Sequence, residues 1–255
     1  MAFLHVLGVY GSLPRGYGGT SSFLLGEERV LIDCGPTTPV ALEKIGVDPI
    51  TIENLLVTHL HGDHTLGIPL LLLEMVMRGR KGKISIYGSD ITLNSVSSII
   101  RNSFPSILDK TDLSLEFVPI APGERFVVNQ LEIRTAQADH CPGALGYQIT
   151  TTNWKICFSG DTRPSQNIIK LAENVDILVH EATFNKEKEK LAETSGHSTA
   201  SQAGIVASKA KVKRLVLTQC EPLSRVDTET MIREAGSTFK GEIIVPKEFE
   251  RIKIY

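Results

Sequence analysis

The chain of 255 residues is 42% hydrophobic and 22% charged, which is typical of a globular protein, and we expect a single domain over residues 1–255. Its 27 Lys and Arg are balanced by 29 Asp and Glu, so the total charge gives no general attraction to a polyanion. No apolar stretch reaches the roughly 20 residues that span a bilayer, and the chain starts without a secretory signal, so we expect no membrane segment and a cytoplasmic location.

Short strands open the chain, at residues 3–10, 20–25 and 29–33, and the Gly-rich stretch 11–19 separates the first two. The pattern then alternates between the two kinds of element: helix 40–45, strand 55–58, helix 66–78, strand 84–87 and helix 91–101. The cation cluster Arg78 to Lys83 stands between a helix and a strand, where it is typical of a solvated loop, with a role in RNA or phosphate binding left open.

The second half repeats this order. Strands are expected at residues 113–118, 125–128, 131–136, 147–150 and 155–158, followed by helix 165–172, strand 177–179, helix 199–209, strand 214–217, helix 228–238 and strand 243–245. Thr199 and Gln202 form a capping box at the start of one helix. Strands that alternate with amphipathic helices in both halves predict a layered α/β fold with helices outside the sheets.

The most informative segment is Thr58 to His64, with the sequence Thr-His-Leu-His-Gly-Asp-His directly after the expected strand 55–58. At this composition, chance would place such a cluster of three His and one Asp in about one in 5,000 chains of this length. Successive side chains of an extended segment alternate sides, so His59 and His61 point the same way and can bind one ion.

After the turn at Gly62, Asp63 and His64 point in a different direction and can address a second ion or a water. The spacing therefore predicts a dinuclear site in a loop between a strand and a helix. Imidazole and carboxylate ligands without thiolate favour Zn²⁺ and also admit Mn²⁺, Fe²⁺ or Co²⁺.

Two isolated residues at strand ends are candidates for the remaining ligands. His140 follows strand 131–136, and Asp161 follows strand 155–158, where its carboxylate could bridge two ions. Each residue type is also common at turns, so the presence of the cluster at Thr58 to His64 decides in favour of metal binding.

Glu181 and His197 form a candidate acid pair. Glu181 ends a buried strand in His180-Glu181-Ala182-Thr183, and His197 opens a helix in His197-Ser198-Thr199. A carboxylate can hold and charge an imidazole for use as a general acid. The alternative is that Glu181 caps a helix and that His197 is merely solvated.

Together these segments resemble the metallo-β-lactamase superfamily, and within it the ribonuclease Z group of tRNA 3′-processing endonucleases. The resemblance covers most of the chain and rests on the Gly-rich loop, Leu31 to Gly35, Thr58 to His64, His140, Ser159 to Thr162, His180 to Phe184, and His197 to Thr199. It implies a four-layer αββα sandwich with the site at one edge between the sheets. It also implies that His59, His61 and His140 hold one metal, that Asp63 and His64 hold another, and that Asp161 bridges.

Three departures from the family pattern concern the second metal and the substrate. Gln219 stands where the family places a histidine that completes the second metal site, and Cys220 or Glu221 is left as a possible substitute. Only 20 residues separate His140 from Asp161, so the tRNA-clamping arm of longer members has no room. The Glu-Gly-Thr-Gln sequence that usually follows Asp-Cys-Gly is replaced by Pro36 to Pro39.

The leading functional hypothesis is a metal-dependent phosphodiesterase of ribonuclease Z type. A hydroxide formed from metal-bound water would attack the phosphorus, Asp63 would orient or deprotonate that water, and His197 held by Glu181 would protonate the leaving oxygen. The substrate would be a phosphodiester, which includes a tRNA precursor. The first alternative is a hydrolase of small phosphodiesters, cyclic nucleotides, lactones or other esters, and the second is a weakly catalytic binding protein with an impaired second metal site. The resemblance also makes a homodimer plausible.

Overall fold

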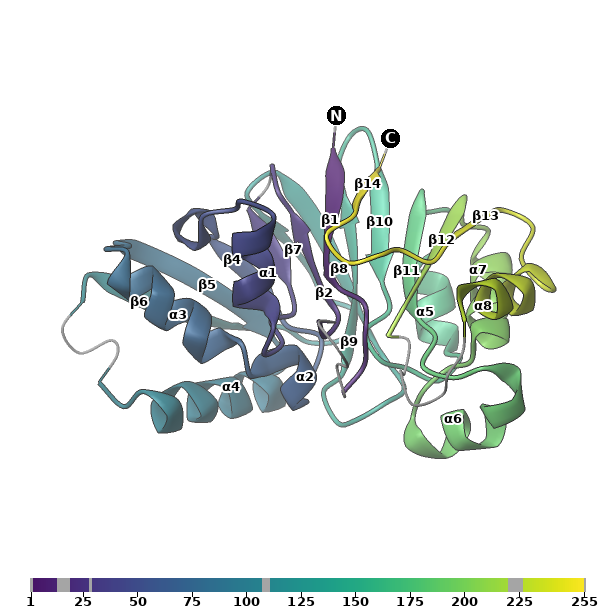
Figure 1. Ribbon diagram of the computed structural model, residues 1–255, viewed down its shortest axis with the longest axis horizontal. Coiled ribbons are helices and arrows are strands. Elements are labelled where there is room, and N and C mark those ends of the chain that lie inside the picture. Colours follow the sequence, from purple (N-terminus) through teal and green to yellow (C-terminus); the bar gives the residue numbers. More distant parts are fainter. Residues whose placement is uncertain (1, 13–18, 28, 107–110, 220–226, 255) are drawn as a thin grey trace.

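The computed structural model describes residues 2–12, 19–27, 29–106, 111–219 and 227–254. Within them the chain forms two mixed sheets of seven strands each, which face one another and carry helices on their outer surfaces (Figure 1). The two chain ends lie side by side at one edge of the sandwich (Figure 1).

The first sheet has the order β14-β1-β2-β3-β4-β5-β6. Its strands are β1 (Phe3–Gly8), β2 (Ser22–Leu25), β3 (Val30–Ile32), β4 (Asn54–Leu56), β5 (Gly82–Gly88), β6 (Leu113–Pro119) and β14 (Arg251–Lys253). β1, β2 and β3 form an antiparallel meander, whereas β3 to β6 run parallel. Parallel neighbours need a crossover connection, and the helices that alternate with these strands provide it.

The second sheet repeats this plan with the order β13-β12-β11-β10-β9-β8-β7. Its strands are β7 (Arg125–Val128), β8 (Leu131–Gln137), β9 (Leu145–Thr150), β10 (Lys155–Phe158), β11 (Ile177–Glu181), β12 (Arg214–Thr218) and β13 (Glu242–Ile244). The strands from β7 to β10 are antiparallel, and those from β10 to β13 are parallel. The order of elements predicted for both halves is therefore confirmed.

The helices of the first half are α1 (Thr38–Lys44), η1 (Pro49–Thr51), α2 (Gly62–Thr65), α3 (Ile68–Met77) and α4 (Asp90–Ser103). Those of the second half are α5 (Gln166–Leu171), η2 (Lys186–Lys188), α6 (Glu189–Ser195), α7 (Ala200–Ala210) and α8 (Thr228–Gly236). The capping box of Thr199 and Gln202 is present at the start of α7. Within the described part of the chain, none of the helices combines the length and the apolar character needed to cross a membrane.

Three layers of buried apolar side chains hold the four layers of structure together. The first lies between the sheets and contains Leu25 and Tyr147; the second joins α3 to the first sheet through Leu72; the third joins α7 to the second sheet through Val206. Successive residues of β4 show how one strand serves two layers, because Leu55 faces the helices and Leu56 faces the other sheet. This arrangement confirms the predicted αββα sandwich.

Five elements of the described residues were not predicted: the 3₁₀ helices η1 and η2, of three residues each, and β14, α6 and α2. β14 offers only Ile252 as a buried side chain and forms because it pairs with β1 at the sheet edge. α6 buries only Ala192 and lacks an apolar stripe. α2 is a single turn of four residues, too short for helical periodicity to show.

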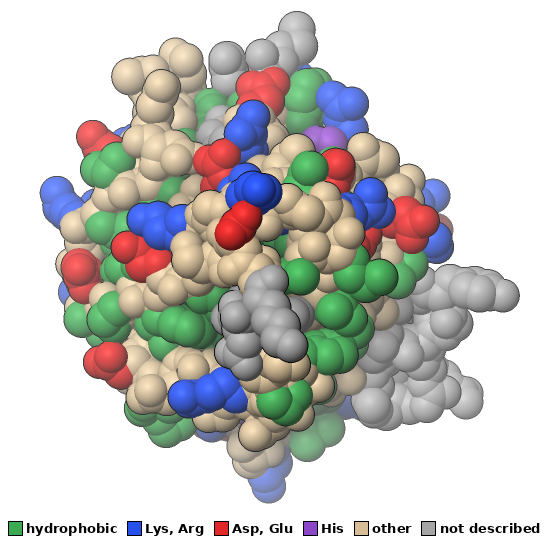
Figure 2. All heavy atoms as spheres, turned by 90° about the vertical axis from the view of Figure 1, so that its left-hand side faces the viewer, with side chains coloured by type: hydrophobic (Ala, Val, Ile, Leu, Met, Phe, Trp, Pro, Cys, Tyr) green, Lys and Arg blue, Asp and Glu red, His purple; other side chains and the backbone are tan. Residues whose placement is uncertain are grey.

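The cation cluster Arg78 to Lys83 lies where α3 leads into β5, and three of its four cations are paired with carboxylates, beginning with Arg78 and Glu74 at 2.8 Å. Lys81 pairs with Asp112 at 3.0 Å and Lys83 with Glu116 at 2.8 Å, all four side chains being largely exposed. Figure 2, which views the molecule from the side of β6, shows Lys and Arg side chains scattered among Asp and Glu. These contacts favour a solvated connection over a site for a polyanion.

The topology brings the chemically active segments to one edge. The strands β3 and β4 are parallel, and so are β10, β11 and β12, while β8 runs in the same direction as β10 because β9 is antiparallel to both. Residues that follow the carboxyl ends of parallel strands meet at the same edge of a sheet. Both sheets place these ends near α2 (Figure 1).

Candidate metal centre

The segment Thr58 to His64 leads from β4 into α2. His61 is extended (φ −62°, ψ 150°) and precedes Gly62, where the helical turn begins. The prediction of a loop is therefore wrong for its second half, because Asp63 and His64 lie in a turn of helix.

Asp33 anchors this segment, a role that its sequence neighbours do not reveal. Its carboxylate accepts hydrogen bonds from the backbone N–H of Thr58 (2.7 Å), the hydroxyl of Thr58 (2.8 Å) and Nδ1 of His64 (2.8 Å). Asp33 is only 5% exposed and has a left-handed backbone with φ of 57°. Nearby, a Cβ on Gly35 would lie 2.0 Å from the carbonyl oxygen of Asp63, so only glycine permits this close approach of the two backbones.

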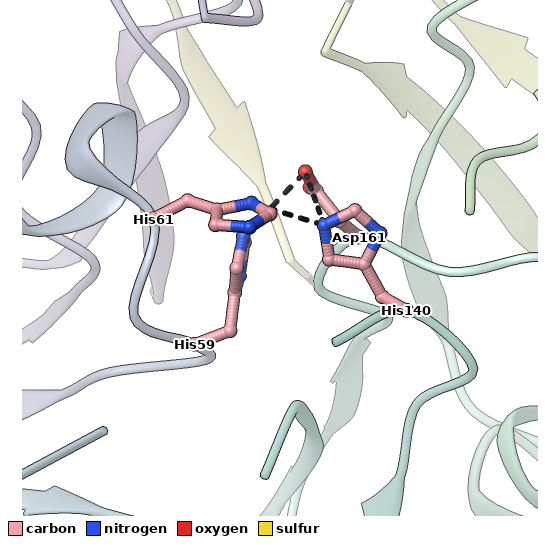
Figure 3. Close-up of side chains that lie close together, drawn as sticks. All are labelled: His59, His61, His140 and Asp161. Atoms are coloured by element: carbon pink, nitrogen blue, oxygen red, sulfur yellow. Dashed lines mark hydrogen bonds and ion pairs between the residues drawn. The ribbon is translucent and has the colours of Figure 1, made fainter. Parts of the chain in front are cut away.

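Four of the predicted ligands converge in Figure 3. His59 and His61 approach from the segment after β4, His140 from the segment after β8, and Asp161 from the segment after β10. Nε2 of His140 lies 3.1 Å from Nδ1 of His61, and Nε2 of His59 lies 3.7 Å from Oδ2 of Asp161. One ligand atom from each of the four residues lies within 4.8 Å of the others, a spacing that suits a shared divalent ion.

Hydrogen bonds on the far side of the rings point nitrogen lone pairs toward this centre. Nδ1 of His140 donates to the carbonyl of Gly196 (2.8 Å), and Nδ1 of His59 faces the hydroxyl of Thr58 (3.0 Å). Such partners fix the tautomer of a metal ligand and leave Nε2 free to bind. Nε2 of His59 is buried with no hydrogen-bond partner, which is the condition that a bound ion would relieve. The residues present therefore fit a divalent metal ion.

Protonation at the centre also matches metal binding. Burial, reinforced by the neighbouring imidazoles, lowers the pKa of His59 well below its ordinary value. Burial alone would raise the pKa of Asp161, but the imidazoles of His64 and His59 outweigh it and hold that pKa well below the usual range. A neutral imidazole and an ionised carboxylate are the forms that a metal ion requires.

The second predicted group, Asp63, His64 and Asp161, also comes together, with one ligand atom of each within 4.8 Å of the others. Its surroundings differ from those of the first group, because the side chain of Gln219 lies among the three. Nε2 of Gln219 is 3.1 Å from Oδ2 of Asp161, 3.3 Å from Oδ2 of Asp63 and 3.3 Å from Nε2 of His64. Cys220 and Glu221, the possible substitute ligands, lie outside the described residues.

Glu181 and His197 are in direct contact, which favours the acid pair over the alternative in which Glu181 caps a helix and His197 is merely solvated. Nδ1 of His197 is 2.9 Å from Oε1 of Glu181 and 3.8 Å from Oδ2 of Asp161. Burial alone would lower the pKa of His197, but the carboxylates of Glu181 and Asp161 raise it to about 9. Thr183, which was not singled out before, donates its hydroxyl to Oε2 of Glu181 at 2.7 Å and holds the carboxylate in place.

A cleft of about 370 Å³ opens over these groups. It is lined by Gly11, Ser12, His61, Gly62, Asp63, Asp161, Thr183, His197 and Gln219. The candidate water-orienting residue Asp63 and the candidate acid His197 thus face the same space. A substrate in this cleft would reach both.

Comparison with known families supports this picture. A family model described as Anti-Pycsar protein Apyc1 matches residues 10–204. A ribonuclease Z from Bacillus velezensis is 30% identical over 275 aligned positions, which cover 87% of this chain and 88% of the relative. Because this alignment is longer than the 255-residue chain, the relative carries inserted residues that this chain lacks.

Two solved structures have the same architecture over nearly their whole length. The metallo-β-lactamase fold protein YhfI from Bacillus subtilis has a TM-score of 0.84 at 22% identity and is covered to 98%, as is this chain. The short form of human tRNase Z has a TM-score of 0.79 at 26% identity, with 99% of each chain covered. The resemblance predicted from the motifs is confirmed.

We expect replacement of Asp33 by alanine to weaken binding of a divalent ion about 10- to 100-fold, the typical effect of losing a hydrogen-bond partner behind a metal ligand, because Asp33 holds the Thr58 hydroxyl that faces Nδ1 of His59. The change leaves Nδ1 of His64 and the N–H of Thr58 without their acceptor. Competition with a chelating dye measures the affinity. Asp112→Ala, which removes an exposed carboxylate, is the control, and equal affinities of the two variants would contradict the anchoring role of Asp33.

Proposed function

The chain belongs to the family of Anti-Pycsar protein Apyc1, with a metallo-β-lactamase fold that it shares with ribonuclease Z, and from this premise we propose a metal-dependent phosphodiesterase of ribonuclease Z type. The observation that supports it best is the contact of Glu181 with His197 beside Asp161. This contact places a charged proton donor next to the candidate ion site. Phosphodiester cleavage needs such a donor, because the leaving alkoxide is a strong base.

We propose Zn²⁺ as the ion, bound by His59, His61, His140 and Asp161, since nitrogen and oxygen ligands without thiolate suit it. Mn²⁺ or Fe²⁺ also suits this ligand set. When bound, such an ion lowers the pKa of a water toward about 7 and offsets negative charge on the phosphate.

The protein's own groups then have separate tasks. Asp63 lines the cleft and would orient the attacking water and accept its proton. Glu181 accepts from the backbone N–H of Thr162 (2.9 Å) and from His197, so its position is fixed. With Nδ1 of His197 engaged by Glu181, Nε2–H would be the proton that reaches the leaving oxygen.

We also propose that residues 1–255 form one hydrolase domain, because strands of both sheets contribute to a shared core. The cytoplasmic location and the homodimer stay predictions from the sequence.

Replacement of Asp63 by alanine should lower turnover of bis(p-nitrophenyl) phosphate by about 10²- to 10⁴-fold, the usual contribution of a positioned acid or base. The ion bound by His59, His61 and His140 should be retained, because Asp63 does not belong to that group. Turnover and metal content are measured on the same preparation, with Asp90→Ala, at an exposed helix start, as the control. Near-normal turnover in the Asp63 variant would sink this assignment.

The role of His197 is tested by varying the leaving group. His197→Ala should lower the hydrolysis of a diester with an alkyl alcohol leaving group by about 10²- to 10⁴-fold. It should affect a p-nitrophenyl diester far less, since nitrophenolate leaves without protonation. A purely structural role would lower both rates equally. The control is His5→Ala in β1, outside the cleft.

A second candidate, hydrolysis of small phosphodiesters such as cyclic nucleotides, is favoured by the segment between His140 and Asp161. The residues between them form the β9–β10 hairpin and its connections, without an arm that could clamp a tRNA. Three of the four cations between Arg78 and Lys83 are paired with carboxylates, which also weakens the case for a polyanion site there.

A panel of three substrates separates these candidates. We expect hydrolysis of bis(p-nitrophenyl) phosphate in either case. Cleavage of a tRNA precursor at its 3′ trailer would support the ribonuclease Z-type substrate, whereas turnover of cyclic nucleotides with an intact precursor would support the second candidate. No turnover with any divalent ion would contradict both and favour a binding protein. Lactone hydrolysis without diester hydrolysis would also overturn the proposal.

A further inference from the structure

We propose that the second ion site of this fold is closed in this chain, and that the carboxamide of Gln219 takes the place of the ion, so that each chain binds one divalent ion. The inference deepens the proposed function and rests on the ion centre at His59, His61 and His140. In this inference Gln219 is more than the absence of a histidine ligand, because its side chain occupies the space where the second ion would bind.

The backbone aims Gln219 into the site. Gln219 directly follows β12 and has a φ of 63°, a left-handed conformation that is uncommon for residues other than glycine. Its side chain is 2% exposed. The conformation turns the residue inward from the strand end, beside the groups that follow β4 and β10.

The carboxamide nitrogen occupies the middle of the second group. Its distances of 3.1 Å to Asp161, 3.3 Å to Asp63 and 3.3 Å to His64 join it to every member of that group. A zinc ion would lie about 2.0–2.2 Å from the same atoms. The nitrogen and an ion therefore compete for one space.

The neighbouring carboxylates determine whether the nitrogen or the oxygen of the Gln219 amide points into the second group. Two carboxylate oxygens need a donor, and the NH₂ group supplies two N–H bonds, one for Asp63 and one for Asp161. The other end, Oε1 of Gln219, is buried without a protein partner, and the residue also lines a cavity of about 20 Å³ between the sheets. This cavity has room for one water that could donate to Oε1. If the side-chain amide were rotated by 180°, its oxygen would face the carboxylate oxygens of Asp63 and Asp161, and acceptors would then repel one another.

The first group shows the contrast. Nε2 of His59 is buried with no hydrogen-bond partner, and the nearest oxygen of Asp161 is 3.7 Å away. At the shared residue Asp161 the amide of Gln219 donates to Oδ2 (3.1 Å), but no carboxamide of the described residues donates to the three imidazoles of the first group. One of the two sites is thus open to an ion, and the other is filled by a donor of the protein itself.

The experiment counts ions per chain. The 255-residue protein is saturated with Mn²⁺ or Zn²⁺ and passed through a desalting column, after which bound metal is measured by elemental mass spectrometry and by mass spectrometry of the intact protein. We expect one ion per natural chain and two per chain for Gln219→His, because imidazole supplies a ligand and removes the competing N–H groups. The exchange coupling of two Mn²⁺ ions in the electron paramagnetic resonance spectrum gives a second readout that does not depend on activity.

Two further variants test which group binds the single ion and whether the Gln219 side chain blocks the other. His59→Ala should lose the single ion, which places it in the first group, and retention of that ion would overturn the inference. Gln219→Ala should admit a second ion at higher metal concentration, because the space opens without a new ligand. Two ions in the natural chain, bound as tightly as in Gln219→His, would refute the closed site while leaving the proposed function intact. A chain that binds no ion would contradict the proposed function itself.

Discussion

The carboxylate of Asp33 is the constraint on which the centre depends. It joins the end of β3 to the segment after β4 through Thr58 and to α2 through His64, so one buried group sets the direction of the whole ligand segment. A buried carboxylate is costly unless its oxygens are fully hydrogen-bonded, and three donors meet that need. The packing of two sheets brings the strand ends together, but this carboxylate converts their proximity into a defined geometry.

The site concentrates buried polar groups that the fold alone does not need. His59, His64 and Asp161 are each less than 4% exposed, and Nε2 of His59 has no partner. A sequence selected only for stability would fill this space with apolar side chains, since an unpaired buried polar group costs on the order of 1–3 kcal/mol. The free-energy cost of these buried polar groups falls at the position where a divalent ion fits. The surrounding layers, rich in buried Leu, Ile and Val, supply the stability that such a centre lacks.

Much of the fold and part of the site could be predicted from the sequence. The alternation of apolar segments predicted the order of the elements, and the spacing of His59 and His61 predicted a shared ion because an extended chain repeats every two residues. The helical turn at Gly62 escaped prediction since four residues carry no periodicity. The role of Asp33 escaped as well, because it depends on a partner 31 positions away. The conformation of Gln219 could not be foreseen, since a left-handed backbone at glutamine is set by its surroundings.

His140 links the two halves of the chemistry. Its Nε2 faces His61 in the candidate ion centre, while its Nδ1 donates to the carbonyl of Gly196, the residue just before His197. A Cβ on Gly196 would lie 2.8 Å from that same Nδ1, so the backbone passes as close as glycine allows. An ion that fixes the His140 ring thereby also fixes the start of the segment that carries the proton donor. The same histidine therefore couples the position of the proposed ion site to the position of the proposed proton donor.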